Sequence, residues 1–125
     1  KKEQGTIREG LCSHHLQRLA PGELVRMRVR PSSFRPPVSL MDSPVIMVGP
    51  GTGISPIMGF LQARARALRK GTVHSLAPCL VYFGCRDSSE TLYAEQLRRW
   101  LEEGVITELH VAMSREGPKV CRRYP

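Results

Sequence analysis

The sequence has 125 residues, 41% of them apolar, and its 19 Lys and Arg against 11 Asp and Glu give a net charge of +8. This length is typical of one domain with a real but modest core. The positive charge favours anionic partners such as nucleic acid, phosphorylated ligands or acidic proteins, and does not choose among them. No apolar run approaches the roughly 18 residues that a membrane span needs, so we expect no spanning helix.

The four cysteines, Cys12, Cys79, Cys85 and Cys121, form no CxxC pair. We therefore expect neither a metal site nor a disulfide framework, and reduced thiols fit a cytosolic compartment. No signal peptide heads the sequence, which starts without Met. We expect an excerpt of a longer protein.

The first third of the sequence predicts a helix, a strand and a connector. Residues 10–19 have helical spacing of their leucines and end at a Pro-Gly turn. Residues 23–30, ELVRMRVR, alternate apolar and charged side chains, which predicts a half-buried strand. Residues 31–44 are rich in Pro and Ser and are interpreted as a connector.

After the connector, short apolar runs alternate with helical patterns. The runs are 45–48, 79–83 and 109–113, and the helical patterns are 56–70 and 88–103. Such alternation is typical of a parallel sheet with right-handed crossovers. The sequence thus predicts an α/β fold, and residues 119–125, KVCRRYP, show no helix or strand pattern.

Side-chain roles follow from helical spacing. Leu97, Trp100 and Leu101 are expected in the core, as is Cys79 in its apolar run. The charged residues of 56–70 are expected on a solvated helix face, and the less favoured alternative is a role at the nucleotide edge or toward a partner: Arg64, Arg66, Arg69 and Lys70.

The loops that follow the three apolar runs carry groups suited to phosphate. They contain Gly49–Gly53 with Thr52, then Arg86, then Ser114 and Arg115. Parallel strands end at one edge of the sheet, where ligands bind. Glycines, a helix N-terminus and arginines there favour a dinucleotide phosphate.

Competing glycine motifs fit less well. A P-loop requires a Lys that is absent here, and Ile54 stands where the third Gly of GxGxxG would fall. NAD sites usually place an acidic residue after the second strand, whereas this sequence has Cys85 and Arg86. A cation suits a 2′-phosphate, which favours NADP over NAD.

Three motifs in this order, VGPGTGISP, VYFGCRD and AMSREGPKV, resemble the NADP-binding module of diflavin reductases of the ferredoxin–NADP reductase superfamily. GLCSHHL resembles the family's FAD-pyrophosphate helix, and VRPSSFRPP resembles the exit from its flavin-binding barrel. The resemblance implies the tail of an FAD-binding β-barrel domain in residues 1–43 and an NADP-binding α/β domain in residues 44–125. It departs from the family at Cys121, where a tyrosine is expected.

The resemblance also implies a role for each matching residue and an NADPH-dependent reductase of the NADPH–haemoprotein type. NADPH would pass a hydride to FAD, and FMN would pass electrons to an acceptor such as a cytochrome. The implied FAD contacts are Gly10, Leu11, Cys12 and Ser13, and the implied NADPH contacts are Gly51, Thr52, Gly53, Cys85, Arg86, Ser114, Arg115 and Lys119. Cys85 is the implied catalytic residue beside the nicotinamide.

The implied partners are NADPH, an FMN-binding domain and a redox acceptor, without nucleic acid. The implied location is cytoplasmic, with the alternative of an anchor to the endoplasmic reticulum in a segment upstream. We expect these 125 residues alone to be inactive.

Two alternatives stay open at this stage. Cys85 could instead be a buried thiol at a strand end. The chain could be a basic, non-catalytic module for nucleic acid or an acidic partner, although its aromatic content of 6% is sparse for stacking on bases.

Overall fold

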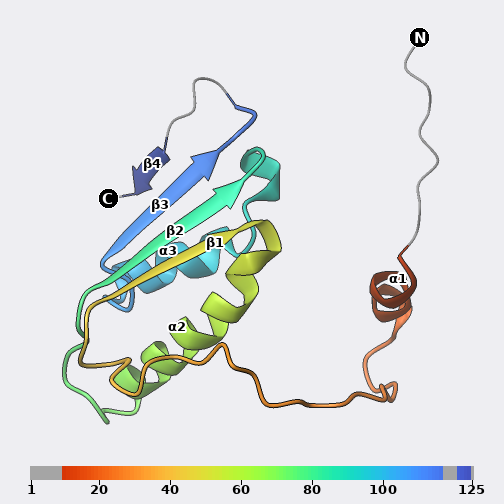
Figure 1. Ribbon diagram of the computed structural model, residues 1–125, viewed down its shortest axis with the longest axis horizontal. Coiled ribbons are helices and arrows are strands. Elements are labelled where there is room, and N and C mark those ends of the chain that lie inside the picture. The colour runs from red at the N-terminus through yellow and green to blue at the C-terminus, as the bar shows by residue number, and fades with distance from the viewer. Residues whose placement is uncertain (1–9, 117–120, 125) are drawn as a thin grey trace. The chain divides into compact units, whose positions relative to one another are not determined.

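The computed structural model (Figure 1) describes residues 10–116 and the backbone of 121–124, and the chain divides into two units after Ser33. None of the helices within these described ranges is long and apolar enough to cross a bilayer.

In the first unit, α1 spans Leu11–Arg18 and confirms the predicted helix. The hydroxyl of Ser13 donates to the carbonyl of Gly10 over 3.3 Å, and Arg18 in the last turn complements the helix dipole. The chain then leaves the helix at Leu19, whose backbone is extended.

The predicted strand at 23–30 is wrong. Within the described part of the chain these residues pair with no strand, and Met27 and Val29 are exposed. An alternating pattern favours a strand, but the strand forms only where a neighbour takes up its backbone hydrogen bonds. The first unit offers no such neighbour among its described residues.

The second unit is built on one sheet in the order β1-β2-β3-β4. The strands β1 (Val45–Pro50), β2 (Cys79–Cys85) and β3 (Glu108–Met113) are parallel, which confirms the predicted α/β fold with a parallel sheet. The strand β4 (Cys121–Tyr124) pairs antiparallel with β3. The strand β4 was not predicted, because a four-residue edge strand rich in charge carries no apolar pattern.

Two helices connect the parallel strands. The helix α2 (Ile54–Arg69) confirms the first helical pattern, and the second pattern is only partly helical. There the 3₁₀ turn η2 (Ser88–Glu90) comes first and α3 covers only Ala94–Glu102. Tyr93, with φ 57°, interrupts the chain between them in a left-handed conformation that no helix can contain.

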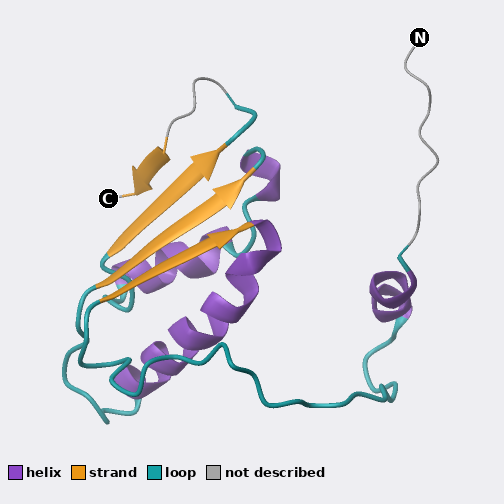
Figure 2. Cartoon of the chain, viewed as in Figure 1, coloured by secondary structure: helices purple, strands orange, loops and turns teal. Residues whose placement is uncertain are grey.

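Both helices cover one face of the sheet (Figure 2). The strand order advances in one direction, and right-handed crossovers then fall on one side. Burial follows the same division, since Val81 and Phe83 of β2 are buried and Leu80 and Tyr82 are half-buried. Leu97 and Trp100 of α3 lie in this core as expected, and Leu101 packs partly buried against it.

Arg64 of α2 is fully buried, which corrects its predicted place on a solvated helix face. Its guanidinium donates to the carbonyl oxygens of Leu40 at 2.5 Å and Val105 at 3.3 Å, and also to that of Ala77. Burial lowers the pKa of this guanidinium from its ordinary value. The three carbonyl groups replace the water that the charge gives up.

We expect Arg64→Met to lower the free energy of unfolding by about 3 kcal/mol or more, because each buried carbonyl left unpaired costs about 1–3 kcal/mol. Urea denaturation of the 125-residue chain measures this. The control Arg66→Met changes an exposed neighbour on the same helix and should stay within about 0.5 kcal/mol. An equal loss of stability in both variants would contradict a stabilising role for the three carbonyl contacts of Arg64.

A pH dependence follows from Cys79, which is fully buried at the start of β2. Burial raises the pKa of this thiol, and the charge of Arg64 opposes the shift. Above the ordinary thiol pKa of about 8.5, unfolding therefore releases a proton. Stability should be constant below that pH and fall as pH rises toward the folded-state pKa, by at most about 1.4 kcal/mol per pH unit.

Cys79→Ala should remove this alkaline component from urea midpoints measured across the range, whereas Cys12→Ala, at an exposed position, should keep it. An identical alkaline decline in wild type and Cys79→Ala would show that the thiol is not its source.

Candidate functional site

Three loops meet at the carboxyl edge of the parallel sheet (Figure 1). The register aligns Pro50 of β1 with Gly84 of β2, and Cys85 of β2 with Met113 of β3. All three strands thus end at similar heights, and the following loops begin side by side.

The first loop is shaped by glycines that serve different purposes. A Cβ at Gly49 would lie 2.8 Å from Cδ1 of Ile57 and 3.0 Å from the carbonyl of Gly53, so only glycine allows α2 to start so close to β1. Gly51 opens the 3₁₀ turn η1 (Gly51–Gly53) with φ +53°, a left-handed value that glycine adopts without strain. The space beside Gly51 is open.

The N-terminus of α2 points out of this loop without a cap. No side chain hydrogen-bonds to its first turn, and that turn contains no acidic residue. Thr52 is exposed beside it. The amide of Ile54 already donates to the carbonyl oxygens of Gly51 and Thr52, so the groups that suit an anion here are the η1 backbone, the positive end of the dipole and the Thr52 hydroxyl.

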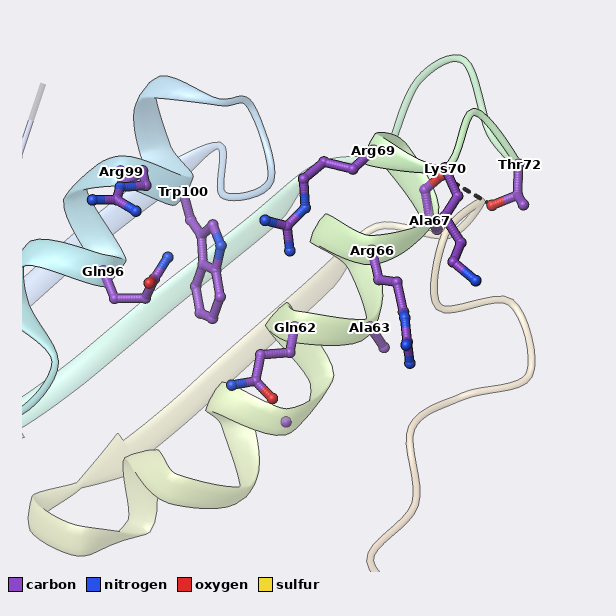
Figure 3. A pocket seen from close by; sticks show the side chains of 11 residues that line it. Gln62, Ala63, Arg66, Ala67, Arg69, Lys70, Thr72, Gln96, Arg99 and Trp100 are labelled. Carbon is purple, nitrogen blue, oxygen red and sulfur yellow. Dashed lines mark hydrogen bonds between the residues drawn. The ribbon is translucent and has the colours of Figure 1, made fainter. Parts of the chain in front are cut away.

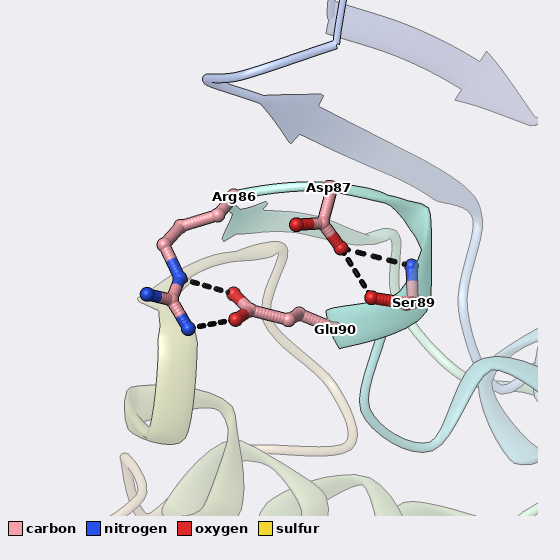
Figure 4. A network of polar contacts seen from close by, with 4 residues as sticks. All are labelled: Arg86, Asp87, Ser89 and Glu90. Carbon is pink, nitrogen blue, oxygen red and sulfur yellow. Dashed lines mark hydrogen bonds and ion pairs between the residues drawn. The ribbon is translucent and has the colours of Figure 1, made fainter. Parts of the chain in front are cut away.

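The second loop holds its arginine in an ion pair. The guanidinium of Arg86 contacts the carboxylate of Glu90 through two nitrogens, with Nε at 2.7 Å from Oε2 (Figure 4). Beside it, Asp87 accepts hydrogen bonds from the amide and the hydroxyl of Ser89, which fixes η2. The Arg86 side chain remains 57% exposed, so it reaches solvent while paired.

Hydrogen bonds join the third loop to the second. The amide of Ser114 donates to the carbonyl of Cys85 over 3.0 Å, and that of Arg115 donates to the carbonyl of Arg86 over 2.8 Å. The amide and hydroxyl of Ser88 donate to the carboxylate of Glu116 at 2.8 and 2.6 Å. Arg115 is exposed and has no ion pair within the described residues.

Cys85 closes β2 as a nearly buried side chain, 8% exposed. Its Sγ lies 3.8 Å from the hydroxyl oxygen of Thr91. The thiol therefore lies at the boundary between the core and the loops.

The predicted site residues fall into three groups. Those at one edge of the sheet are Gly51, Thr52, Gly53, Cys85, Arg86, Ser114 and Arg115. Those on α1 and its N-cap, in the first unit, are Gly10, Leu11, Cys12 and Ser13. Lys119 lies outside the described residues.

Sequence reasoning missed the carboxylates of this edge, Glu90 and Glu116. Glu90 stands four residues after Arg86, a spacing that could have indicated an ion pair. Glu116 contacts Ser88 across 28 positions of sequence, and no local pattern signals that contact. Within the described ranges, no three side chains of His, Cys, Asp or Glu gather as metal ligands.

We expect Gly49→Ala to lower the free energy of unfolding by about 1–3 kcal/mol, because the new methyl group overpacks the contact between β1 and α2. Gly59→Ala is the matched control: a Cβ there meets nothing within 4 Å, and alanine should stabilise α2 by up to about 1 kcal/mol. Thermal and urea unfolding of both variants measure this, and a stable Gly49→Ala would refute the close approach.

Residues 47–121 match the family model described as oxidoreductase NAD-binding domain. NADPH–cytochrome P450 reductase of Rattus norvegicus is 45% identical over 121 residues, which cover 91% of this chain and 17% of that protein. The Homo sapiens protein of the same name is 44% identical over 119 residues, covering 90% of this chain and 17% of its own length. A nitric oxide synthase-like protein of Bombyx mori is 35% identical over 114 residues, which are 90% of this chain and 10% of that protein.

These matches confirm the resemblance to the diflavin reductases, and the chain spans 17% of the length of the mammalian relatives. The matched region begins inside β1 and ends in β4, so it takes in all three loops of the carboxyl edge. With this fold and these loops, the chain belongs to the oxidoreductase NAD-binding domain family.

Proposed function

We propose that this chain is the NADPH-binding and FAD-contacting part of a flavoprotein oxidoreductase. The observation that carries the proposal is the convergence of three phosphate-suited loops at one sheet edge, with Arg115 hydrogen-bonded through its amide to the Arg86 carbonyl. The similarity to NADPH–cytochrome P450 reductases supports the same cofactor.

Each loop has a part in holding the nucleotide. The η1 turn and the uncapped start of α2 would receive the pyrophosphate, with Thr52 adding a hydroxyl. Ser114 and Arg115 would bind the 2′-phosphate, where the exposed guanidinium, which has no ion pair among the described residues, offers two parallel donors. Lys119 would assist at the same end.

The contribution of Arg86 to nucleotide binding would depend on Glu90, because that carboxylate already contacts its guanidinium. A phosphate would compete with that carboxylate or share the guanidinium with it. The net charge of this loop is therefore lower than its arginine alone indicates, and Arg115 would dominate the preference for a 2′-phosphate.

When bound, NADPH supplies a hydride from its nicotinamide ring to the flavin. The residues of this chain position the ring and exclude water, and the nearly buried Cys85 at the end of β2 would lie beside the nicotinamide. The first turn of α1, with Gly10, Leu11, Cys12 and Ser13, would approach the FAD pyrophosphate as part of a flavin domain's barrel tail.

The rest of the route belongs to the same proposal. Electrons would pass from FAD through an FMN-binding domain to a haemoprotein such as a cytochrome, at the cytoplasmic side of the endoplasmic reticulum or in the cytosol. The 125 residues would bind nucleotide without completing electron transfer alone.

Calorimetric titration of the chain with 2′,5′-ADP and with ADP tests the site directly. We expect the 2′-phosphorylated nucleotide to bind more tightly, and Arg115→Ala to weaken it by about 10- to 100-fold, the loss of one charge-assisted contact. Binding of ADP should change little, since it lacks the 2′-phosphate.

Lys70→Ala is the charge-matched control, because Lys70 lies at the far end of α2 from these loops. Equal affinity for the two nucleotides in the wild-type chain would end the NADP assignment. Stronger binding of an oligonucleotide, with a steep salt dependence, would favour a nucleic-acid module instead.

A further inference from the structure

A basic groove of about 670 Å³ lies between α2 and α3 (Figure 3). Its cationic rim consists of Arg66, Arg69, Lys70 and Arg99. The groove runs along α2 from Gly59 to Lys70, and its cations lie toward the end of that helix that is away from the candidate nucleotide site: Arg69 is about 22 Å along the helix from Ile54.

The four rim cations, Arg66, Arg69, Lys70 and Arg99, are exposed, and none has an ion pair or a side-chain hydrogen bond among the described residues. Among the described residues that line the groove there is no carboxylate. Each cation stands near the C-terminal end of its helix, where the dipole favours it. That preference accounts for each cation by itself, and together the four give the groove a positive charge that would attract an anionic partner.

The floor of the groove suits a protein segment rather than a nucleic acid. Trp100 contributes the aromatic ring, but only 3% of the residue is exposed, so no base can stack on it. Gly59 and Ala63 of α2 expose little side chain and let a backbone approach closely. Helix C-terminal ends present carbonyl groups, which cannot donate to phosphate.

We propose that this groove docks an acidic α-helical segment of a partner protein. Arginine guanidinium groups bind carboxylates through paired donors, and three of the four rim cations are arginines. Glutamates four residues apart share one face of a helix and would meet the two rims of the groove. The groove shares no residue with the candidate nucleotide site, so partner docking and nucleotide binding would use separate surfaces.

The probe is a short fluorescent helical peptide with glutamates at every fourth position in an alanine background, titrated against the chain at low salt. Trp100, the single tryptophan, reports docking through its own fluorescence. We expect binding that weakens with added salt and disappears for the peptide with glutamine in place of glutamate.

The double variant Arg66→Gln, Arg99→Gln should lower the affinity for the glutamate peptide by at least about tenfold, which corresponds to the loss of roughly one ion pair. The control Arg26→Gln, Arg28→Gln removes the same charge from exposed positions of the first unit and should bind normally. Affinity for 2′,5′-ADP should be unchanged in both, which separates this proposal from the nucleotide site.

Charge reversal provides a second test that does not depend on loss of binding. A variant with all four rim cations changed to glutamate, Arg66→Glu, Arg69→Glu, Lys70→Glu and Arg99→Glu, should bind the matching lysine peptide and reject the glutamate peptide. The proposal is overturned if the glutamate peptide does not bind, or if the glutamine variants of the groove and of the first unit weaken its binding equally. It is also overturned if a single-stranded oligonucleotide of equal charge displaces the peptide by binding to the same arginines.

Discussion

The guanidinium of Arg64 is the contact on which the second unit depends. It joins three segments that are distant in sequence: the approach to β1 at Leu40, the approach to β2 at Ala77, and the turn after α3 at Val105. All three segments lie at the edge where the parallel strands start. One buried charge thus fixes the strand starts, and the strands carry that alignment to the loops at their far ends.

The sheet consequently separates stability from binding. Its starting edge is held by Arg64 and by the fully buried Cys79, whose amide donates to the hydroxyl of Thr107 over 3.0 Å. Its finishing edge is held by backbone contacts between loops, such as the bond from Ser114 to Cys85, while Thr52 and Arg115 stay exposed. A ligand can therefore contact the finishing edge without disturbing the core.

The parallel strands could be predicted because continuous apolar runs between turn residues have few other interpretations. Arg64 was expected on the solvated face because it is charged. Its position, three residues after Leu61 and four before Leu68, nevertheless lies within the apolar stripe of α2. The strand expected at 23–30 failed because pairing depends on a neighbour that no local pattern reveals. The ion pair of Arg86 with Glu90 was not predicted either, and it lowers the positive charge of a loop whose place at the sheet edge was predicted.

That ion pair has a consequence for the exchange of nucleotide. Glu90 neutralises Arg86 in advance, so in the proposed nucleotide site an arriving phosphate would displace the carboxylate or share the guanidinium with it. The energy gained on arrival would be correspondingly small, and the carboxylate would be at hand to reclaim the guanidinium on departure. Under that proposal the ion pair would sacrifice tightness in favour of rapid release of the carrier.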